Sequence, residues 1–308
     1  MKPFFSYYGG KQRMAKKIIR LIPKHMVYVE PFSGGASVLF LKPFPKVTNG
    51  DCYREVINDT NKLVYNFYNQ LRWNPRKLKR LINCTAYCEQ THSESVCICQ
   101  GKKIVDDLTR AWAFFVNINM SFGNIFNAGW GRGLFRTNLS YSWYSKINNL
   151  NRYLSRMQGV HISCVDALTC IRQWDSPQTF FYIDPPYVDT NQGDYSGYTQ
   201  KHLDKLIRLL KKIDGSFILS GYENNSYPDT WERFEFKSYC SASVKGKANK
   251  NRNKSVKASS KDLGNRDRTE IVLRHITKKP VRPEIEEIYK MQENKQGGRM
   301  KEYIFGKH

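Results

Sequence analysis

Residues 27–41 read VYVEPFSGGASVLFL, and this stretch decides the fold class. Val27–Glu30 has the apolar pattern of a short buried strand, and residues 31–37 form a small-residue turn before an apolar segment. A second strand is predicted at residues 56–59; it ends in an acid and is followed by an amphipathic helix. This order of strand, glycine turn, helix and strand is typical of a Rossmann-like βαβ unit.

The alternation of strands and helices breaks off at about residue 72 and resumes near residue 149. The interval holds a predicted helix at residues 106–117 and a loop rich in Gly, Asn and aromatic residues at 119–132. After it we predict strands at 161–165, Thr179–Ile183, 217–220 and 270–275, with an amphipathic helix over 203–213. We therefore expect an α/β domain made of residues 1–70 and 149–277, a mainly helical insertion at 71–148, and a polar basic tail at 278–308.

The composition narrows the class of protein. The chain has 308 residues, with 50 Lys and Arg against 27 Asp and Glu, a formal charge of +23. This excess favours a polyanionic partner such as nucleic acid over a small metabolite. An apolar fraction of 40% excludes wholesale disorder, and no apolar run is long enough for a membrane span. Residues 1–10 lack the features of a signal peptide, so we expect a cytoplasmic protein whose eight cysteines are reduced.

The sharpest chemical signal is Asp184-Pro185-Pro186-Tyr187, directly after the apolar strand Thr179–Ile183. Two consecutive prolines end the strand and fix a rigid, extended turn at its carboxyl end. Open α/β sheets bind their ligands at that end of the strands. The motif therefore indicates a site at this edge of the sheet.

Together with Tyr7-Tyr-Gly-Gly-Lys11 and Glu30-Pro-Phe-Ser-Gly-Gly-Ala-Ser37, this motif resembles the Dam-type DNA adenine-N6 methyltransferases. The resemblance extends from about Phe4 to His275, with the cofactor motif, the target-recognition insertion and the catalytic motif in family order. It implies a Rossmann-like methyltransferase core with an inserted, mainly helical target-recognition domain. It also implies site-specific transfer of a methyl group from S-adenosyl-L-methionine to N6 of an adenine flipped out of double-stranded DNA.

The chemistry explains the residue types in the catalytic motif. The lone pair of adenine N6 is delocalised into the ring, so acceptors for its two N–H groups would make the nitrogen more nucleophilic. Asp184 and the carbonyl of Pro185 are suited to that role, and Tyr187 would stack on the base. The predicted catalytic residues are Asp184, Pro185, Pro186 and Tyr187.

The predicted cofactor site combines the glycine turn with acids at strand ends. Gly34 and Gly35 allow close backbone approach, although such a turn alone is weak evidence. Asp59 has the spacing of a ribose-binding acid, with a helix N-cap as the alternative and Asp51 as a competitor. Asp166 resembles the family's acid near the cofactor's adenine, again with a cap as the alternative. With the residues that the resemblance implies, the predicted set is Tyr7 (where the family usually has Trp), Lys11, Glu30, Phe32, Gly34, Gly35, Asp59, Asp166 and Asp184.

Two segments are predicted to contact DNA. In the loop at 119–132, Asn124 and Arg132 are suited to reading base edges, and Phe126 or Trp130 to wedging into the base stack. Between residues 245 and 268 there are nine Lys or Arg and two Asp, which favours contact with phosphates over a merely solvated loop. The predicted DNA-binding residues are Asn119, Asn124, Phe126, Trp130, Arg132, Lys245, Lys247, Lys250, Arg252 and Lys254.

Several alternatives stay open. The cluster Cys84, Cys88, Cys97 and Cys99 with His92 suggests zinc, but Cys97-Ile-Cys99 is too tightly spaced, and we expect no metal. The acceptor could instead be cytosine N4, an RNA adenine or a protein amide, or the chain could bind DNA without turnover. No heptad pattern indicates an oligomer, so we expect a monomer. Restriction-modification, replication marking and protection of a mobile element are equally compatible with the motifs.

Overall fold

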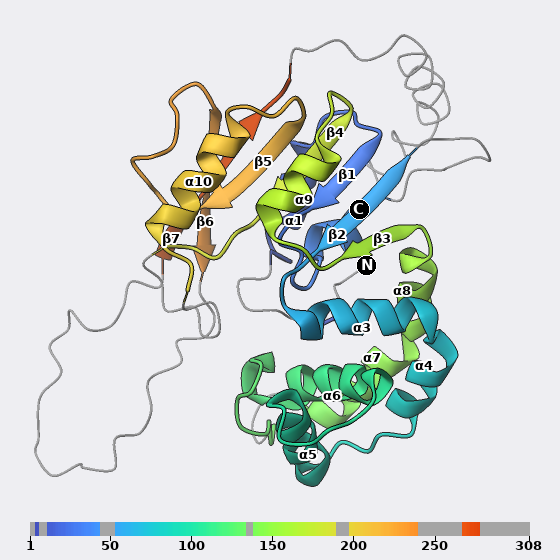
Figure 1. The fold of residues 1–308 in the computed structure, drawn as a ribbon. Coiled ribbons are helices and arrows are strands. Elements are labelled where there is room, and N and C mark those ends of the chain that lie inside the picture. The colour runs from blue at the N-terminus through green and yellow to red at the C-terminus, as the bar shows by residue number, and fades with distance from the viewer. Residues whose placement is uncertain are drawn as a thin grey trace, which may run out of the picture.

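A computed structural model of the chain describes residues 4–5, 11–43, 53–133, 138–188, 197–239 and 267–277. Its centre is a seven-stranded sheet in the order β3-β2-β1-β4-β5-β7-β6 (Figure 1). The strands are β1 (Val27–Glu30), β2 (Arg54–Asn58), β3 (Val160–Ser163), β4 (Thr179–Ile183), β5 (Ser216–Gly221), β6 (Glu232–Tyr239) and β7 (Asp267–His275). Strands β1 to β5 are parallel, and β7 runs antiparallel between β5 and β6.

The chain changes direction across the sheet at β1. From β1 it moves outward through β2 to β3, and then returns to place β4 on the other side of β1. The carboxyl ends of β1 and β4 are therefore neighbours at a topological switch point, where open α/β sheets bind ligands. The predicted α/β, Rossmann-like class is confirmed. Strand β6 was not predicted, and the apolar residues 38–41 lie in the short helix α2 (Ser37–Leu41).

Helices cover both faces of the sheet, because its central strands carry apolar side chains on both faces. One face is covered by α9 (Ala167–Trp174) and α10 (Gln200–Leu210) (Figure 1). Val29 and Phe181 share an apolar core with these two helices. Alternate residues such as Tyr28 face the opposite way, because successive side chains in a strand point to opposite faces. The helices that share this second core include α1 (Ala15–Arg20), α2, α3 (Lys62–Trp73) and α8 (Leu150–Met157).

The described segment between β2 and β3 is helical apart from one isolated bridge between Ser121 and Trp130. After α3 come α4 (Pro75–Asn83), α5 (Glu89–Cys99), α6 (Asp107–Met120), the short 3₁₀ turn η1 (Phe122–Asn124), α7 (Leu139–Asn148) and α8. The rings of Phe67 on α3 and Phe115 on α6 stack with centroids 5.8 Å apart. The helical segment therefore packs into the same apolar core as α3. Nowhere in the described ranges does a helix combine the length and apolarity needed to cross a membrane.

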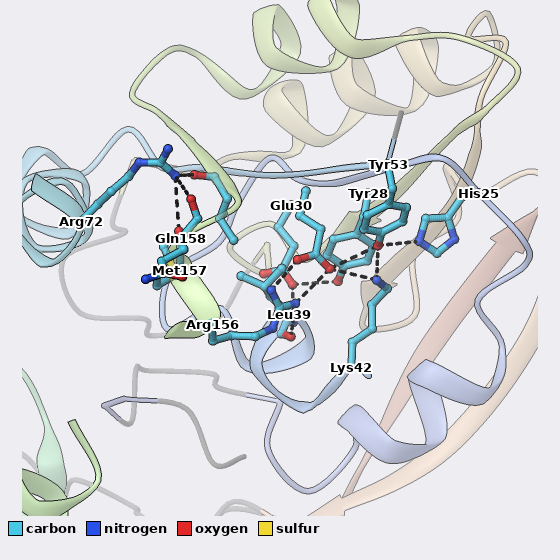
Figure 2. A network of polar contacts seen from close by, with 12 residues as sticks. His25, Tyr28, Glu30, Leu39, Lys42, Tyr53, Arg72, Arg156, Met157 and Gln158 are labelled. Carbon is cyan, nitrogen blue, oxygen red and sulfur yellow. Dashed lines mark hydrogen bonds and ion pairs between the residues drawn. The ribbon is translucent and has the colours of Figure 1, made fainter. Parts of the chain in front are cut away.

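A buried polar network joins α8 to the sheet. Arg156 on α8 donates to Glu55 on β2 (Nη2–Oε1 2.9 Å) and to the carbonyl of Leu39 (3.0 Å). Lys42 lies 3.0 Å from the same Glu55 oxygen, and Figure 2 shows Arg156 and Lys42 approaching the network from different elements. Burial alone would raise the pKa of Glu55, but the two cations together hold it below its ordinary value. This network holds α8 against β2 and α2.

Candidate active site

The glycine turn after β1 is held by an acid from the next strand. Gly34 has φ +46°, and its N–H donates to Oδ2 of Asp59 at 2.8 Å, across 25 residues of chain. Oδ1 of Asp59 accepts the N–H of Asn61 at 2.8 Å, and Asn61 itself is the N-cap of α3. Burial raises the pKa of Asp59, while these two N–H groups oppose the rise. The carboxylate of Asp59 thus shapes the turn, and the N-cap role suggested for it belongs to Asn61.

Glu30, the last residue of β1, is buried beneath the same turn. One of its oxygens accepts the Tyr28 hydroxyl and the Leu39 N–H, both at 2.7 Å. Burial raises the pKa of Glu30 to about 7, even though these hydrogen bonds lower it. Glu30 therefore anchors α2 behind the turn.

The four residues Lys11, Asp184, Tyr187 and Glu270 converge at the carboxyl end of β4. Nζ of Lys11 lies 2.8 Å from Oδ1 of Asp184 and 3.3 Å from Oε1 of Glu270. The Tyr187 hydroxyl lies 2.7 Å from the same Glu270 oxygen and 3.2 Å from Oδ1 of Asp184. Lys11 also lies 4.8 Å from the centroid of the Tyr187 ring. The structure thus brings together three predicted residues and one that was not predicted.

One cation faces two acids in this cluster. Burial raises the pKa values of both Asp184 and Glu270, and Lys11 opposes the rise in each. Burial by itself would lower the pKa of Lys11, but the two carboxylates together raise it. Lys11 is therefore charged at neutral pH and favours the ionised form of both acids. The Asp184 side chain is 18% exposed, so a ligand can reach it.

Glu270 was missed because its strand was interpreted only as a closing element of the sheet. It is the one acid in the predicted strand 270–275 and is 5% exposed. An acid at the start of an otherwise apolar strand is the signal that could have found it, because buried carboxylates are costly unless they are paired. Its partners were not visible in the sequence.

Two further predicted cofactor residues, Phe32 and Asp166, lie in the segments that follow β1 and β3. Phe32 makes an edge contact with Tyr198 at 6.5 Å. Asp166 follows β3 and caps α9, accepting the N–H groups of Leu168 (3.0 Å) and Thr169 (3.2 Å). The cap suggested as the alternative for Asp166 is therefore present. Tyr7 and Asp51 lie outside the described residues.

In the predicted recognition loop, two asparagines hold a lysine that was not predicted. Oδ1 of Asn119 accepts from Lys146 at 2.6 Å, and Oδ1 of Asn124 lies 3.3 Å from the same ammonium. Asn119 is buried and also donates to the carbonyl of Phe115, whereas Asn124 adopts φ +54°. Burial lowers the pKa of Lys146 to about 8.

The other loop residues differ in exposure. Phe126 packs 5.6 Å from the Phe114 ring and Trp130 lies 6.0 Å from Tyr87, both partly buried. The side chain of Arg132 is 65% exposed. The predicted phosphate-binding residues lie outside the described residues: Lys245, Lys247, Lys250, Arg252 and Lys254.

The residues considered for zinc, Cys84, Cys88, His92, Cys97 and Cys99, do not converge on one point as metal ligands would. Cys88 caps α5 by accepting the Thr91 N–H, and His92 lies 2.9 Å from the Ser121 hydroxyl. Cys84, Cys97 and Cys99 are free thiols. Across the part of the chain that the structure describes, no three His, Cys, Asp or Glu side chains gather to hold a metal ion.

A mostly parallel sheet with a glycine turn after β1 and Asp-Pro-Pro-Tyr after β4 is the arrangement expected for a methyltransferase. Residues 7–244 match the D12 class N6 adenine-specific DNA methyltransferase family, and the chain belongs to it. The predicted family resemblance and the predicted adenine-specific DNA methylation are confirmed. Cytosine, RNA and protein acceptors and a binder without turnover are not favoured by this membership.

Three relatives are similar over most of this chain. The type II methyltransferase M.MjaIII of Methanocaldococcus jannaschii is 27% identical, over 77% of this chain and 90% of its own length. The type II methyltransferase M1.LlaDCHI of Lactococcus lactis subsp. cremoris is 23% identical, over 74% of this chain and 82% of its own length. The DNA N-6-adenine-methyltransferase of Escherichia phage P1 is 26% identical, over 68% of this chain and 28% of its own length.

Proposed function

We propose that this DNA adenine methyltransferase uses S-adenosyl-L-methionine and methylates an adenine that has left the duplex and docks beside Asp184. The observation that carries the proposal is the position of Asp184. Its carboxylate follows the end of β4, next to the strand that leads into the Gly34 turn, and it is paired with Lys11 yet remains 18% exposed. Enzymes that modify a base must first take it out of the stack, and the switch point of the sheet is the natural pocket.

The residues at the switch point suit this methyl donor. S-adenosyl-L-methionine supplies an electrophilic methyl group on a positively charged sulfonium. Gly34 lets the backbone approach a ligand closely, and the carboxylate of Asp59 is held beside it as an acceptor for hydroxyl groups. The acids of the cluster favour a cation nearby. The residues proposed to hold the donor are Tyr7, Lys11, Glu30, Phe32, Gly34, Gly35, Asp59, Asp166 and Asp184.

The Asp-Pro-Pro-Tyr turn is proposed to activate the adenine amine. Asp184 and the Pro185 carbonyl would accept the two N6–H groups, which draws the nitrogen toward a geometry with an available lone pair. The Tyr187 ring would stack on the base, a contact worth about 1–3 kcal/mol. Because the hydroxyl of Tyr187 is held by Glu270, its ring is oriented before the base arrives. Pro186 keeps the turn rigid.

We propose that the segment 71–148 recognises the target sequence. Arg132 is exposed and suited to guanine, and Asn124 is suited to adenine. Asn119 and Lys146 support Asn124 from behind. Phe126 and Trp130 are partly buried, so a wedge made by either would require the loop to rearrange.

The basic run at residues 245–268 is proposed to bind phosphates. Replacing Lys245, Lys247, Lys250, Arg252 and Lys254 with Gln should flatten the dependence of log K on log salt by about 0.9 for each phosphate that the variant no longer neutralises. An unchanged slope would remove this run from the DNA interface. We also propose a monomeric, cytoplasmic enzyme. Because two relatives are named type II methyltransferases, we propose that it acts in restriction-modification.

The test is nucleoside mass spectrometry after incubation of the protein with S-adenosyl-L-methionine and mixed-sequence duplex DNA. We expect N6-methyladenine with the wild type and with the control Asp229→Ala, whose side chain is exposed. We expect none with Asp184→Ala, although this variant should still bind DNA. N4-methylcytosine would overturn the proposed acceptor. An unchanged yield with Asp184→Ala would remove Asp184 from the mechanism.

A further inference from the structure

We propose that Glu270 is a positioning residue of the methyl-transfer site, acting through Lys11 and Tyr187 on the way Asp184 receives the adenine amine. This inference rests on the proposed function, because it assigns a role within the same site. It concerns a residue of β7 that lies outside both the glycine-turn motif and the Asp-Pro-Pro-Tyr motif.

Glu270 reaches the site because of the antiparallel pairing of β7. Ile271 pairs with Gly221 on β5, and Val272 pairs with Ser220, so the middle of β7 lies against the carboxyl end of β5 and Glu270 comes just beyond that end. Ile271 packs in the core under α9 and α10, whereas Val272 packs in the core on the opposite face. Because side chains alternate along a strand, Glu270 points to the same face as Val272. That face also holds Tyr182, from β4, the strand that directly precedes Asp184.

The Tyr187 hydroxyl contacts both carboxylates, but at different distances. The Tyr187 hydroxyl lies closer to Glu270 (2.7 Å) than to Asp184 (3.2 Å). Glu270 therefore accepts the stronger hydrogen bond of the Tyr187 hydroxyl, which weakens the competing hydrogen bond of that hydroxyl to Asp184. The same contact fixes the Tyr187 ring at its far end.

The charge balance points the same way. Lys11 is shared between Asp184 and Glu270 and favours the ionised form of each, so the cluster holds two carboxyl groups for one cation. Without the charge of Glu270, Lys11 would neutralise Asp184 completely. The adenine amine gains positive charge as it attacks the methyl group, so a net negative cluster stabilises that transition state more than the ground state.

A role limited to folding does not account for these contacts. A buried carboxylate costs stability unless it is paired, and an apolar side chain would suit the strand better. Glu270 contacts Lys11 and Tyr187, both of which contact Asp184. The acid is thus coupled to the site rather than to the core.

The decisive variant is Glu270→Gln, which keeps the shape of the side chain and an oxygen for the Tyr187 hydroxyl but removes the charge. The measurements are the single-turnover rate with S-adenosyl-L-methionine and duplex DNA, and the Kd for each of the two. We expect the rate to fall about 30-fold or more while both Kd values change by less than about threefold. A rate within threefold of the wild type would overturn the proposal, as would a loss confined to the Kd values.

The control is Glu235→Gln on the neighbouring strand β6, where the side chain is 59% exposed; its rate should equal that of the wild type. If Glu270→Gln does not fold, Glu270→Asp decides. Its shorter side chain keeps the charge but draws the oxygen away from Tyr187, and an unchanged rate would overturn the proposal. The double variant Glu270→Gln with Tyr187→Phe tests whether Glu270 acts through Tyr187. If it does, Glu270→Gln should lower the single-turnover rate by a smaller factor in the Tyr187→Phe protein than in the wild type. A wild type that methylates no DNA would refute the proposed function itself, which is a separate result.

Discussion

The ammonium of Lys11 lies 2.8 Å from Oδ1 of Asp184, in a cluster where both groups are largely shielded from water. The contact joins the segment before α1 to the turn after β4. Burial disfavours the ionised carboxylate, and Lys11 counteracts that effect on the pKa of Asp184. The ion pair thus sets the pH at which Asp184 can accept the hydrogen bonds of an amine.

Loss of Lys11 should move the pH profile of methyl transfer. In Lys11→Met, burial and the neighbouring Glu270 and Glu30 act on Asp184 without a compensating cation, so its pKa rises. The acid limb of the single-turnover rate should shift upward by about one pH unit or more. The exposed control Lys16→Met should keep the wild-type limb. An unmoved limb in Lys11→Met would show that Asp184 does not depend on this ion pair.

Asp59 should control the affinity for the methyl donor. Asp59→Ala removes the acceptor of the Gly34 and Asn61 N–H groups and the proposed acceptor for ribose hydroxyls. Hydrogen bonds to a charged group contribute about 1.5–3 kcal/mol, so the Kd for S-adenosyl-L-methionine should rise about tenfold or more in calorimetric titration. Asp107→Ala is the control, because that side chain is 67% exposed on α6. Equal Kd values for the two variants would exclude Asp59 from the donor site.

Glu30 should make the folded state less stable as the pH rises. Its pKa is about 7 in the folded protein, above the ordinary value of 4.5. A raised pKa means that the folded state binds the proton of Glu30 more tightly than the unfolded state does. The contribution of this proton to the free energy of unfolding is therefore complete below pH 4.5 and is lost as the pH passes 7. The difference corresponds to about 3 kcal/mol. Urea unfolding of Glu30→Gln from pH 5 to 8 should show a flatter dependence than the wild type, and parallel curves would contradict this assignment.

Arg156 should be important for stability rather than for chemistry. Arg156→Met leaves Glu55 buried with only Lys42 as a charged partner, and breaking a buried ion pair costs about 3–5 kcal/mol. The free energy of unfolding in urea should fall by that amount, whereas the exposed control Arg152→Met should change it little. The variant Arg156→Met with Glu55→Gln should recover part of the loss. A full loss in this double variant would show that the ion pair itself is not the cause.

The core strands were predictable because they are buried on both faces. Thr179–Ile183 is an unbroken apolar run, and the structure has β4 at the same residues. Strand β6 was not predicted, because its charged residues alternate with Phe234 and Phe236 and leave no continuous apolar run. Such a pattern is usual for a strand at the edge of a sheet. Its identity as a strand depends on pairing with β7, which is distant in the sequence.

The sequence predicted only those site residues that belong to a motif or follow the end of a strand. Spacing placed Asp59 and Asp166 at equivalent positions after β2 and β3, but it did not distinguish a ligand from a cap. The structure shows that Asp59 binds the Gly34 turn, whereas Asp166 caps α9. That difference depends on which N–H groups the fold brings near each carboxylate.

The sequence by itself determined where β1 to β5 and β7 lie along the chain, the glycine turn and the placement of Asp184 after an apolar strand, because these are local patterns of burial and backbone preference. Only the tertiary structure decided that Lys11 and Glu270 meet at Asp184 and that Lys146 lies between Asn119 and Asn124. The reason is physical: the charge and hydrogen-bond state of a buried group depends on neighbours from distant parts of the chain, and those neighbours are set by the fold.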